Sequence, residues 1–228
     1  MILNLRYKIL IGFFGFIFIY MTAAFTEMRF KGDLNRIDEH GGMMETTELR
    51  SIGYVKVSNL IQRVIITSAD NSRIEVKSKS GKALQSLDYE VVGDTLLLKS
   101  FNLDKGDPAA VTILLADQNL RGLEVQDTHV TLNKLVQDSL SVSQSGGHVW
   151  FDEANRITQL TIETRDQADV FVYTRLDLLH VETVNSHVVI QSDIGILSGK
   201  ISSQTQLVAN GPEEVRLKRD SSSDFKLY

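Results

Sequence analysis

One short phrase recurs in the second half of the chain, and this repeat restricts the fold more than any other feature. The stretch LTIETRDQADVFVYT, residues 160–174, aligns with LHVETVNSHVVIQS, residues 179–192. Each copy contains a leucine and a branched residue two positions apart, then a polar bend, then a second segment with alternating apolar positions. Because residues two apart in an extended chain share a face, both segments predict short β-strands with one buried side.

The unit occurs four times, and a degenerate fifth copy is expected around Ile201, Leu207 and Ala209. The first segments are residues 123–125, 140–142, 160–162 and 179–181. The second segments start their apolar alternation at residues 130, 149, 170, 188 and 207, which are 19, 21, 18 and 19 residues apart. A short-stranded unit with this period is typical of a solenoid, in which each coil buries its apolar face against its neighbours.

We therefore expect an all-β protein, a right-handed parallel β-solenoid whose coils stack about 4.8 Å apart. The inward side chains would form continuous aliphatic columns, and small polar or glycine residues would fill the bends. An antiparallel β-sandwich is the alternative, because its strands also alternate and also recur about every 8–12 residues.

The other segments predict how the chain is organised around these coils. Strands without a regular period fill the region before the repeat, and a solenoid needs a cap over its open end. A strand is also expected around Val215 and Leu217. The expected organisation is a membrane segment at 1–31, a tether at 32–48, a less regular N-terminal β cap with the first coils at 49–110, solenoid coils at 111–218 and a flexible tail at 219–228.

An uncharged run near the N-terminus predicts one membrane helix. Residues 9–25 contain no charge and six aromatic side chains, and basic residues flank them. A helix of this length spans about 26 Å, close to the thickness of a bilayer core. We expect an uncleaved anchor with a cytoplasmic N-terminus; a secretory signal with Thr22 and Ala24 at positions −3 and −1 is the alternative. A buried core helix would have to be covered on every side.

Under either membrane interpretation, the rest of the chain is exported. The expected location is the bacterial cell envelope, as a single-pass membrane protein with its C-terminal domain in the periplasm, or as a secreted protein after cleavage. The chain has no cysteine, which excludes disulfides, thiolate metal sites and a lipidated cysteine. Outside residues 1–31 it has 20 basic and 28 acidic residues, a net charge of −8 that disfavours nucleic acid as a partner.

If the coils are in register, outward residues form two columns on one face. The first column contains His129, His148, Asp169, His187 and Gln206. Imidazoles and a carboxylate at this spacing could share a metal ion. Zinc, however, needs ligands that converge on one point, whereas the residues of a column lie along a line. We therefore predict neither a metal nor a cofactor. The second column contains Trp150, Phe171, Val189 and Val208. An exposed apolar stripe predicts an interaction surface, for self-association or another partner, unless the tether or tail covers it.

Two glutamates raise an enzymatic alternative. Glu163 and Glu182 are expected to stack on consecutive coils, and parallel β-helices host many polysaccharide lyases and hydrolases. Equivalent positions in other coils are expected to hold Gln126, Ser143 and Ser202, and the bends are too short to build a groove. We therefore expect no catalytic residues, and a carbohydrate-active β-helix enzyme remains the alternative.

A family resemblance also favours an exported protein. The stretch ELRSIGYVKVSNLIQRVIITSADNSRIEVKS, followed by LDYEVVGDTLLLKSF, resembles the opening of the auto-transporter adhesin head domain (head GIN domain) family, and the similarity extends over residues 49–217. The resemblance implies an exported bacterial envelope protein with solenoid coils. We therefore predict a membrane-tethered envelope module with a non-catalytic binding, adhesion-like or scaffolding role, whose partner is an envelope protein or a glycan.

Overall fold

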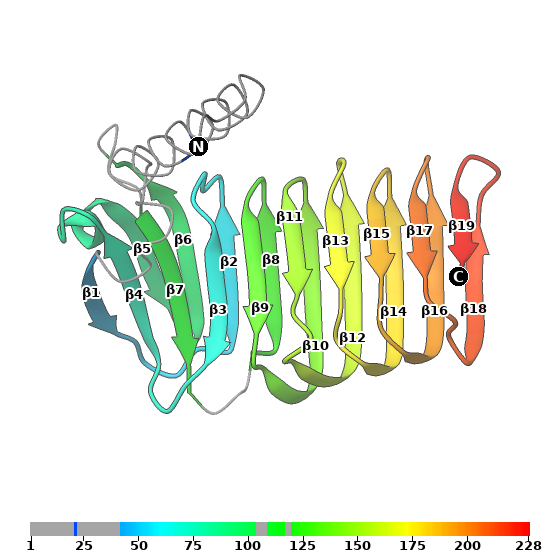
Figure 1. Cartoon of the computed structure of the whole chain (residues 1–228), viewed down its shortest axis with the longest axis horizontal. Coiled ribbons are helices and arrows are strands. Elements are labelled where there is room, and N and C mark those ends of the chain that lie inside the picture. Colours follow the sequence, from blue (N-terminus) through cyan, green and yellow to red (C-terminus); the bar gives the residue numbers. More distant parts are fainter. Residues whose placement is uncertain (1–20, 22–41, 104–108, 117–119) are drawn as a thin grey trace, which may run out of the picture. The chain divides into compact units, whose positions relative to one another are not determined.

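The computed structural model describes residue 21 and residues 42–103, 109–116 and 120–228. Among these residues the regular structure is almost entirely β: ten strands form one sheet, sheet A, and nine form a second, sheet B (Figure 1). The expected membrane segment at 1–31 lies outside the described residues except for Met21. Within the described part of the chain, no helix is long and apolar enough to cross a membrane.

Six consecutive coils form the regular part of the protein, and each contributes one strand to sheet B and the next to sheet A (Figure 1). Neighbouring coils pair in parallel in both sheets, which confirms the solenoid and excludes the antiparallel sandwich. The six pairs are β8 (Gly122–Gln126) and β9 (His129–Asn133), β10 (Val136–Ser145) and β11 (His148–Phe151), β12 (Arg156–Arg165) and β13 (Asp169–Val172), β14 (Leu176–Val184) and β15 (His187–Ile190), β16 (Ile194–Ser202) and β17 (Gln206–Ala209), and β18 (Glu214–Arg219) and β19 (Asp224–Leu227).

The N-terminal strands do not stack in sequence order. They are β1 (Met43–Glu48), β2 (Tyr54–Ser58), β3 (Val64–Ser68), β4 (Arg73–Ser78), β5 (Leu87–Val92), β6 (Thr95–Phe101) and β7 (Ala109–Leu115), with a short 3-10 helix η2 (Ala83–Ser86). The coil β2–β3 lies between β6–β7 on one side and β8–β9 on the other. β4 and β5 pair antiparallel with β7 and β6, and β1 covers β4. These antiparallel strands lie at the end where the sequence predicts a cap.

Two predicted segments differ from the structure. Residues 43–48 of the expected tether form strand β1, which is held in place because Glu45 accepts a hydrogen bond from the backbone N–H of Leu84 at 2.8 Å. Within the expected flexible tail, β19 pairs residue for residue with β17, so the last coil is complete. The tail prediction is wrong because only Phe225 and Leu227 carry the apolar alternation, too short a pattern to recognise. Strand β7 also crosses the expected boundary between residues 110 and 111.

Inward side chains of sheet A form the aliphatic columns that the sequence predicts. The column members are Val130, Val149, Val170, Val188 and Leu207, each at most 2% exposed and paired in register with its neighbour. A second column runs parallel to it and contains Leu132, Phe151, Val172, Ile190 and Ala209. Burial of these columns stabilises each coil against the next, because a single coil cannot cover its own apolar face.

The register in sheet B differs from the predicted alignment at β8. Leu123 pairs with Val142 and not with Leu140, so Val125 stands beside Gln144. Gln144 is only 1% exposed, and its Nε2 donates to the carbonyl oxygens of Gly146, Gly147 and Asp169 at 3.0, 2.9 and 3.2 Å. A polar residue occupies this position of the core column because its side chain donates hydrogen bonds to carbonyl oxygens at the bend.

The fifth copy of the repeat also begins earlier than predicted. Leu197 pairs with Leu179, whereas Ile201 pairs with Thr183. Gly199 takes the place that Val181 has in the preceding coil, with a φ of 124°, and a Cβ there would lie 1.9 Å from the carbonyl oxygen of Val181. Only glycine fits this close backbone approach, so the hydrophobic signature of the coil is lost from the sequence.

Candidate functional site

Both expected surface columns exist on the outer face of sheet A. His129, His148, Asp169, His187 and Gln206 pair in sequence from β9 to β17, as do Trp150, Phe171, Val189 and Val208 from β11 to β17. We call these the histidine column and the apolar column. Thr131 precedes Trp150 in the apolar column, and Lys226 follows Val208 in β19.

Three aromatic rings gather at the start of the apolar column, and we call them the aromatic cluster: Trp150, Phe171 and Tyr173. The indole of Trp150 stacks on the ring of Tyr173, with centroids 4.6 Å apart and planes at 21°. The Phe171 ring lies 5.3 Å from the indole at 33°. Trp150 is still 39% exposed. Tyr173 is absent from the sequence prediction, although it is the next outward residue after Phe171 and the alternation identifies it.

A groove lies beside this cluster because Thr131 is a short residue in a column that continues with Trp150. The groove has a volume of about 550 Å³ and is lined by Arg63, His129, Val130, Thr131, His148, Trp150 and Phe171. We call it the Trp150 groove. The Arg63 guanidinium donates from Nε and Nη2 to the hydroxyl oxygen of Thr131 at 3.0 and 2.8 Å. Arg63 is therefore fixed at one side of the groove and Trp150 at the other.

The histidine column is linked through one carboxylate. Asp169 Oδ2 lies 2.9 Å from Nδ1 of His148, and Oδ1 lies 3.5 Å from Nδ1 of His187. The rings of His129 and His148 meet edge to face, with centroids 4.4 Å apart. Partial burial, then the neighbouring His148 and then Arg63 lower the pKa of His129 below its usual value. His129 is therefore neutral at physiological pH and offers one donor and one acceptor.

The arrangement does not favour a metal site. Among the residues that the structure describes, no group of three or more histidine, aspartate or glutamate side chains is placed to hold a metal ion. The contacts of the column run from one residue to the next, and a tetrahedral ion needs ligands that converge on one point.

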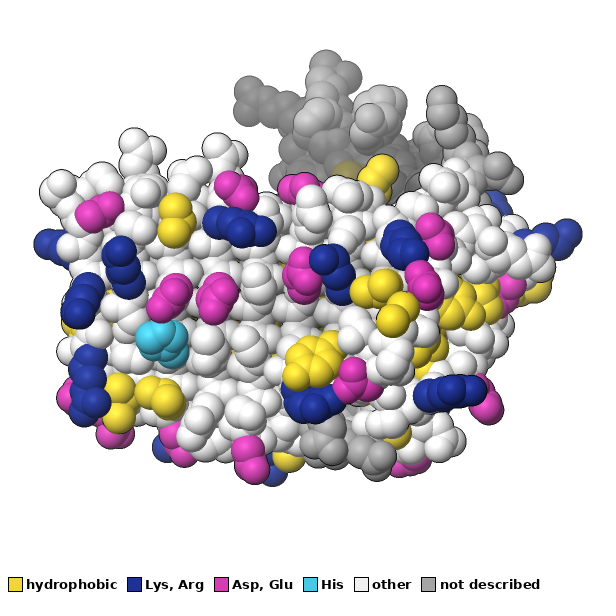
Figure 2. Space-filling view, turned by 180° about the vertical axis from the view of Figure 1, so that it is seen from behind, with side chains coloured by type: hydrophobic (Ala, Val, Ile, Leu, Met, Phe, Trp, Pro, Cys, Tyr) yellow, Lys and Arg dark blue, Asp and Glu magenta, His cyan; other side chains and the backbone are white. Residues whose placement is uncertain are grey.

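The face of sheet B carries the two glutamates. Glu163 and Glu182 pair as the sequence predicts, but Glu124, Ser143 and Lys200 continue their column, whereas Gln126 and Ser202 do not belong to it. This difference follows from the register at β8 and from the earlier start of the fifth coil. Figure 2 shows this face: acidic, basic and hydrophobic side chains are scattered among other side chains and backbone, and one histidine lies beside two acidic side chains. Both glutamates are exposed, and Glu182 lies 3.5 Å from Nε2 of His180.

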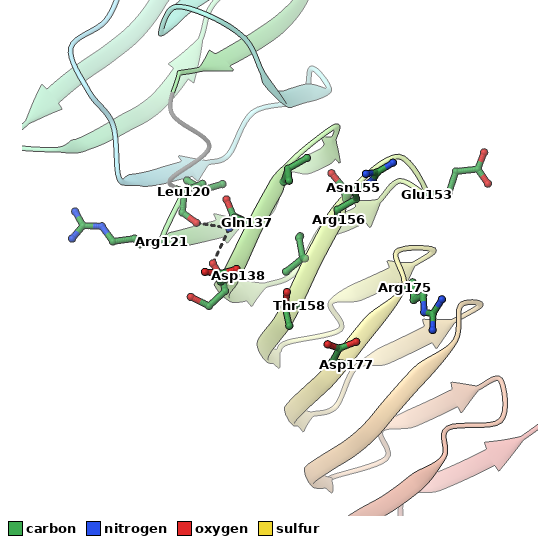
Figure 3. Close-up of a pocket in the computed structure, with 13 residues that line it drawn as sticks. Leu120, Arg121, Gln137, Asp138, Glu153, Asn155, Arg156, Thr158, Arg175 and Asp177 are labelled. Atoms are coloured by element: carbon green, nitrogen blue, oxygen red, sulfur yellow. Dashed lines mark hydrogen bonds between the residues drawn. The ribbon is translucent and has the colours of Figure 1, made fainter.

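A larger hollow, of about 870 Å³, crosses the starts of β10, β12 and β14, and the sequence gives no signal for it (Figure 3). Its lining mixes basic and acidic side chains, including Arg156, Arg175 and Asp177. Figure 3 shows Arg121 and Glu153 directed to opposite sides, away from each other. Because these charges do not converge on a common point, the arrangement lacks the paired carboxylates of a glycosidase.

Comparisons with known proteins show the fold. No protein-family model matches the sequence, and no curated protein matches it. A solved structure from Bacteroides fragilis, described as a "putative adhesin", matches 83% of this chain and 98% of its own, with a TM-score of 0.58 and 13% identity. Another "putative adhesin", from Parabacteroides distasonis, matches the same shares of the two chains with a TM-score of 0.58 and 14% identity. This chain therefore shares a β-solenoid fold with those proteins.

Proposed function

We propose that this protein is a membrane-tethered, exported module of the bacterial cell envelope that binds its partner without catalysis, in an adhesion-like or scaffolding role. The observation that carries the proposal is the aromatic cluster beside the Trp150 groove, in which Trp150 is exposed and Phe171 and Tyr173 are half-buried. Exposed apolar groups cost free energy in water, and contiguous ones commonly mark interaction sites. Aromatic residues and arginine are also the side chains enriched in binding surfaces.

The rigid sheet under the cluster supports a binding role. The strands of sheet A are paired on both sides from β9 to β17, so the backbone beneath the cluster is fixed by hydrogen bonds along its length. Connections between the paired strands of these coils are only two to four residues long. Enzymes of the β-helix class need longer loops that bring carboxylates to one point, and Glu163 and Glu182 instead stand exposed on a flat face.

The cell-envelope location rests on the uncharged run at residues 9–25 and on the resemblance to the auto-transporter adhesin head domain family. It is supported by the shared fold of the two bacterial proteins described as adhesins. Membrane fractionation with N-terminal mass spectrometry of the native protein tests it. An intact N-terminus in the membrane fraction fits an anchor, and a chain that begins at Phe25 fits a cleaved signal. An intact chain in the soluble cytoplasmic fraction would overturn the proposed location.

Binding to isolated envelopes of the producing bacterium tests the role of the cluster. The full chain, purified in mild detergent, is incubated with envelopes and sedimented, and Trp150→Ser is expected to reduce the bound fraction at least about tenfold. Val184→Ser is the matched control, because Val184 is a similarly exposed apolar residue, 44% exposed, in a strand of sheet B. Equal binding by the two variants would contradict a binding surface on sheet A.

A further inference from the structure

We propose that the Trp150 groove binds a saccharide, with a pyranose ring packed against the aromatic cluster and its hydroxyl groups bonded by Arg63 and the histidine column. This inference rests on the proposed function, because it names the class of partner that the surface takes. Three features of the groove point to it: a fixed aromatic wall, polar groups that are not fully used, and a size suited to a small ligand.

The aromatic wall is fixed before any ligand arrives. Stacking on Tyr173 and contact with Phe171 restrict the indole of Trp150, so little side-chain entropy remains to be lost on binding. The face of an aromatic ring carries negative charge in its quadrupole. The C–H groups on one face of a pyranose carry small positive charges, so they complement such a surface. A protein side chain would gain more from a deep apolar pocket than from this open wall.

Polar groups at the groove have unused hydrogen-bonding capacity. Arg63 has five N–H donors and uses Nε and Nη2 to bond Thr131, which leaves donors for a ligand. Nδ1 of His148 faces Asp169, which leaves Nε2 of the same ring for another partner. Neutral His129 adds one donor and one acceptor. Hydroxyl groups both donate and accept, so a sugar matches this mixture better than a purely apolar ligand does.

The size of the groove also favours a saccharide over a protein. Its volume of about 550 Å³ lies within the range of small-molecule sites, roughly 300–1,000 Å³. A stable protein–protein interface buries about 800 Å² on each partner and usually needs desolvated pockets for its anchor residues. Beyond the groove, Val189 and Val208 continue the apolar column, so further sugar units would find a flat path along successive coils.

The groove contains its own reporter, because Trp150 is the only tryptophan of the chain. The full chain in mild detergent is titrated with tetrasaccharides of glucose, mannose and N-acetylglucosamine, and with the members of a glycan array that score as binders. We expect a saturable change in Trp150 fluorescence with at least one saccharide, and calorimetric heat that saturates at the same concentrations.

Two variants and one control locate the binding. Thr131→Phe fills the groove and is expected to weaken saccharide binding at least about tenfold in calorimetry, as is Arg63→Ala, which removes the donors. Thr161→Phe is the control, because Thr161 also faces outward, but on sheet B and away from the groove. This variant should bind saccharide as the original chain does. Circular dichroism confirms that each variant is folded. Equal saccharide affinity in Thr131→Phe and Thr161→Phe would overturn the site.

Failure of this inference is distinguishable from failure of the proposed function. If envelope binding depends on Trp150 but survives periodate oxidation of the envelope glycans, and no saccharide changes the fluorescence, the partner is a protein and the saccharide inference is wrong. Concentration-dependent self-association that Trp150→Ser abolishes, again without a saccharide response, would also overturn it. If Trp150 affects neither envelope binding nor saccharide binding, both proposals fall.

Discussion

Two equivalent positions in neighbouring coils should respond in opposite ways to the same kind of substitution. Gln144 and Thr164 pair across β10 and β12, point into the same core column, and are 1% and 3% exposed. The Nε2 of Gln144 donates to three carbonyl oxygens, whereas within the described structure the hydroxyl of Thr164 has no hydrogen-bond partner. Gln144→Leu and Thr164→Val both replace a polar side chain with an aliphatic one of similar size.

The magnitudes follow from these contacts. Gln144→Leu removes three hydrogen bonds, each with a net value of about 0.5–1.5 kcal/mol. Part of this loss is offset because Oε1 of Gln144 is itself buried without a partner, and removal of such a group gains about 1 kcal/mol. The net expectation is a loss of about 0.5–3.5 kcal/mol. Thr164→Val only removes an unpartnered hydroxyl, so it should gain about 1 kcal/mol.

Thermal unfolding of the full chain, followed by circular dichroism in mild detergent, measures the difference. For a chain of this size about 1 kcal/mol shifts Tm by roughly 2–4 °C. Gln144→Leu should therefore lower Tm by roughly 1–14 °C, and Thr164→Val should raise it by roughly 2–4 °C. If Gln144→Leu left Tm unchanged or raised it, the amide would not serve the bend, and the register assigned to β8 and β10 would be wrong.

Three further predictions concern the bends and the titrating groups. Gly147→Ala should lower the free energy of unfolding in urea by at least about 2 kcal/mol, because its Cβ would lie 2.3 Å from the carbonyl oxygen of Thr128. Gln167→Gly, at a φ of 61°, should instead raise the free energy of unfolding by about 1 kcal/mol. Equal effects of the two substitutions would contradict the bend geometry. The pKa of His129 is lower in the folded chain than in the unfolded chain, so the unfolded chain binds more protons just below pH 6.5 and stability should fall as pH drops through that window. His129→Asn should reduce this dependence of stability on pH. An NMR titration that finds a raised pKa for His129 would refute the prediction. Hydrogen bonds from the backbone N–H of Ser203 and the hydroxyl of Ser223 hold the pKa of Asp220 well below its usual range. The stability that Asp220 contributes should be fully present above about pH 4 and lost as pH falls further, and Asp220→Asn should remove this acid dependence from the last coil, as measured by hydrogen exchange at pH 3 and pH 6.

The second strand of each coil could be predicted from the sequence because its apolar alternation is uninterrupted. Val149 and Val170 mark the inward positions, so the outward columns of His148 and Trp150 follow directly. Most of the candidate surface can therefore be predicted from this alternation alone. Tyr173 follows from the same alternation, two residues after Phe171, whereas its stacking on Trp150 and the groove beside Thr131 depend on side-chain packing, which alternation does not encode.

The first strand of each coil is harder to predict, because structural requirements replace hydrophobic residues at some of its inward positions. Gln144 interrupts its column to satisfy backbone carbonyls, and Gly199 interrupts another because the backbone of Val181 comes too close for a side chain. The spatial order of β2, β6 and β8 cannot be predicted from the sequence either. All three strands have the same apolar alternation, so any of them could pair with any other. Only the packing of the N-terminal strands determines that β2 lies between β6 and β8.

Disulfide formation between engineered cysteines measures the stacking of the coils most directly, and the native chain has no cysteine to interfere. Val189 and Val208 pair in register on the outer face of sheet A, so their Cα atoms should lie about 4.8 Å apart, within disulfide range. The pair Val189→Cys and Gln206→Cys is shifted by two residues, which places the Cα atoms about 8 Å apart, beyond that range. Rapid oxidation of the first pair alone is predicted; oxidation of the shifted pair alone, or of neither, would contradict the in-register columns.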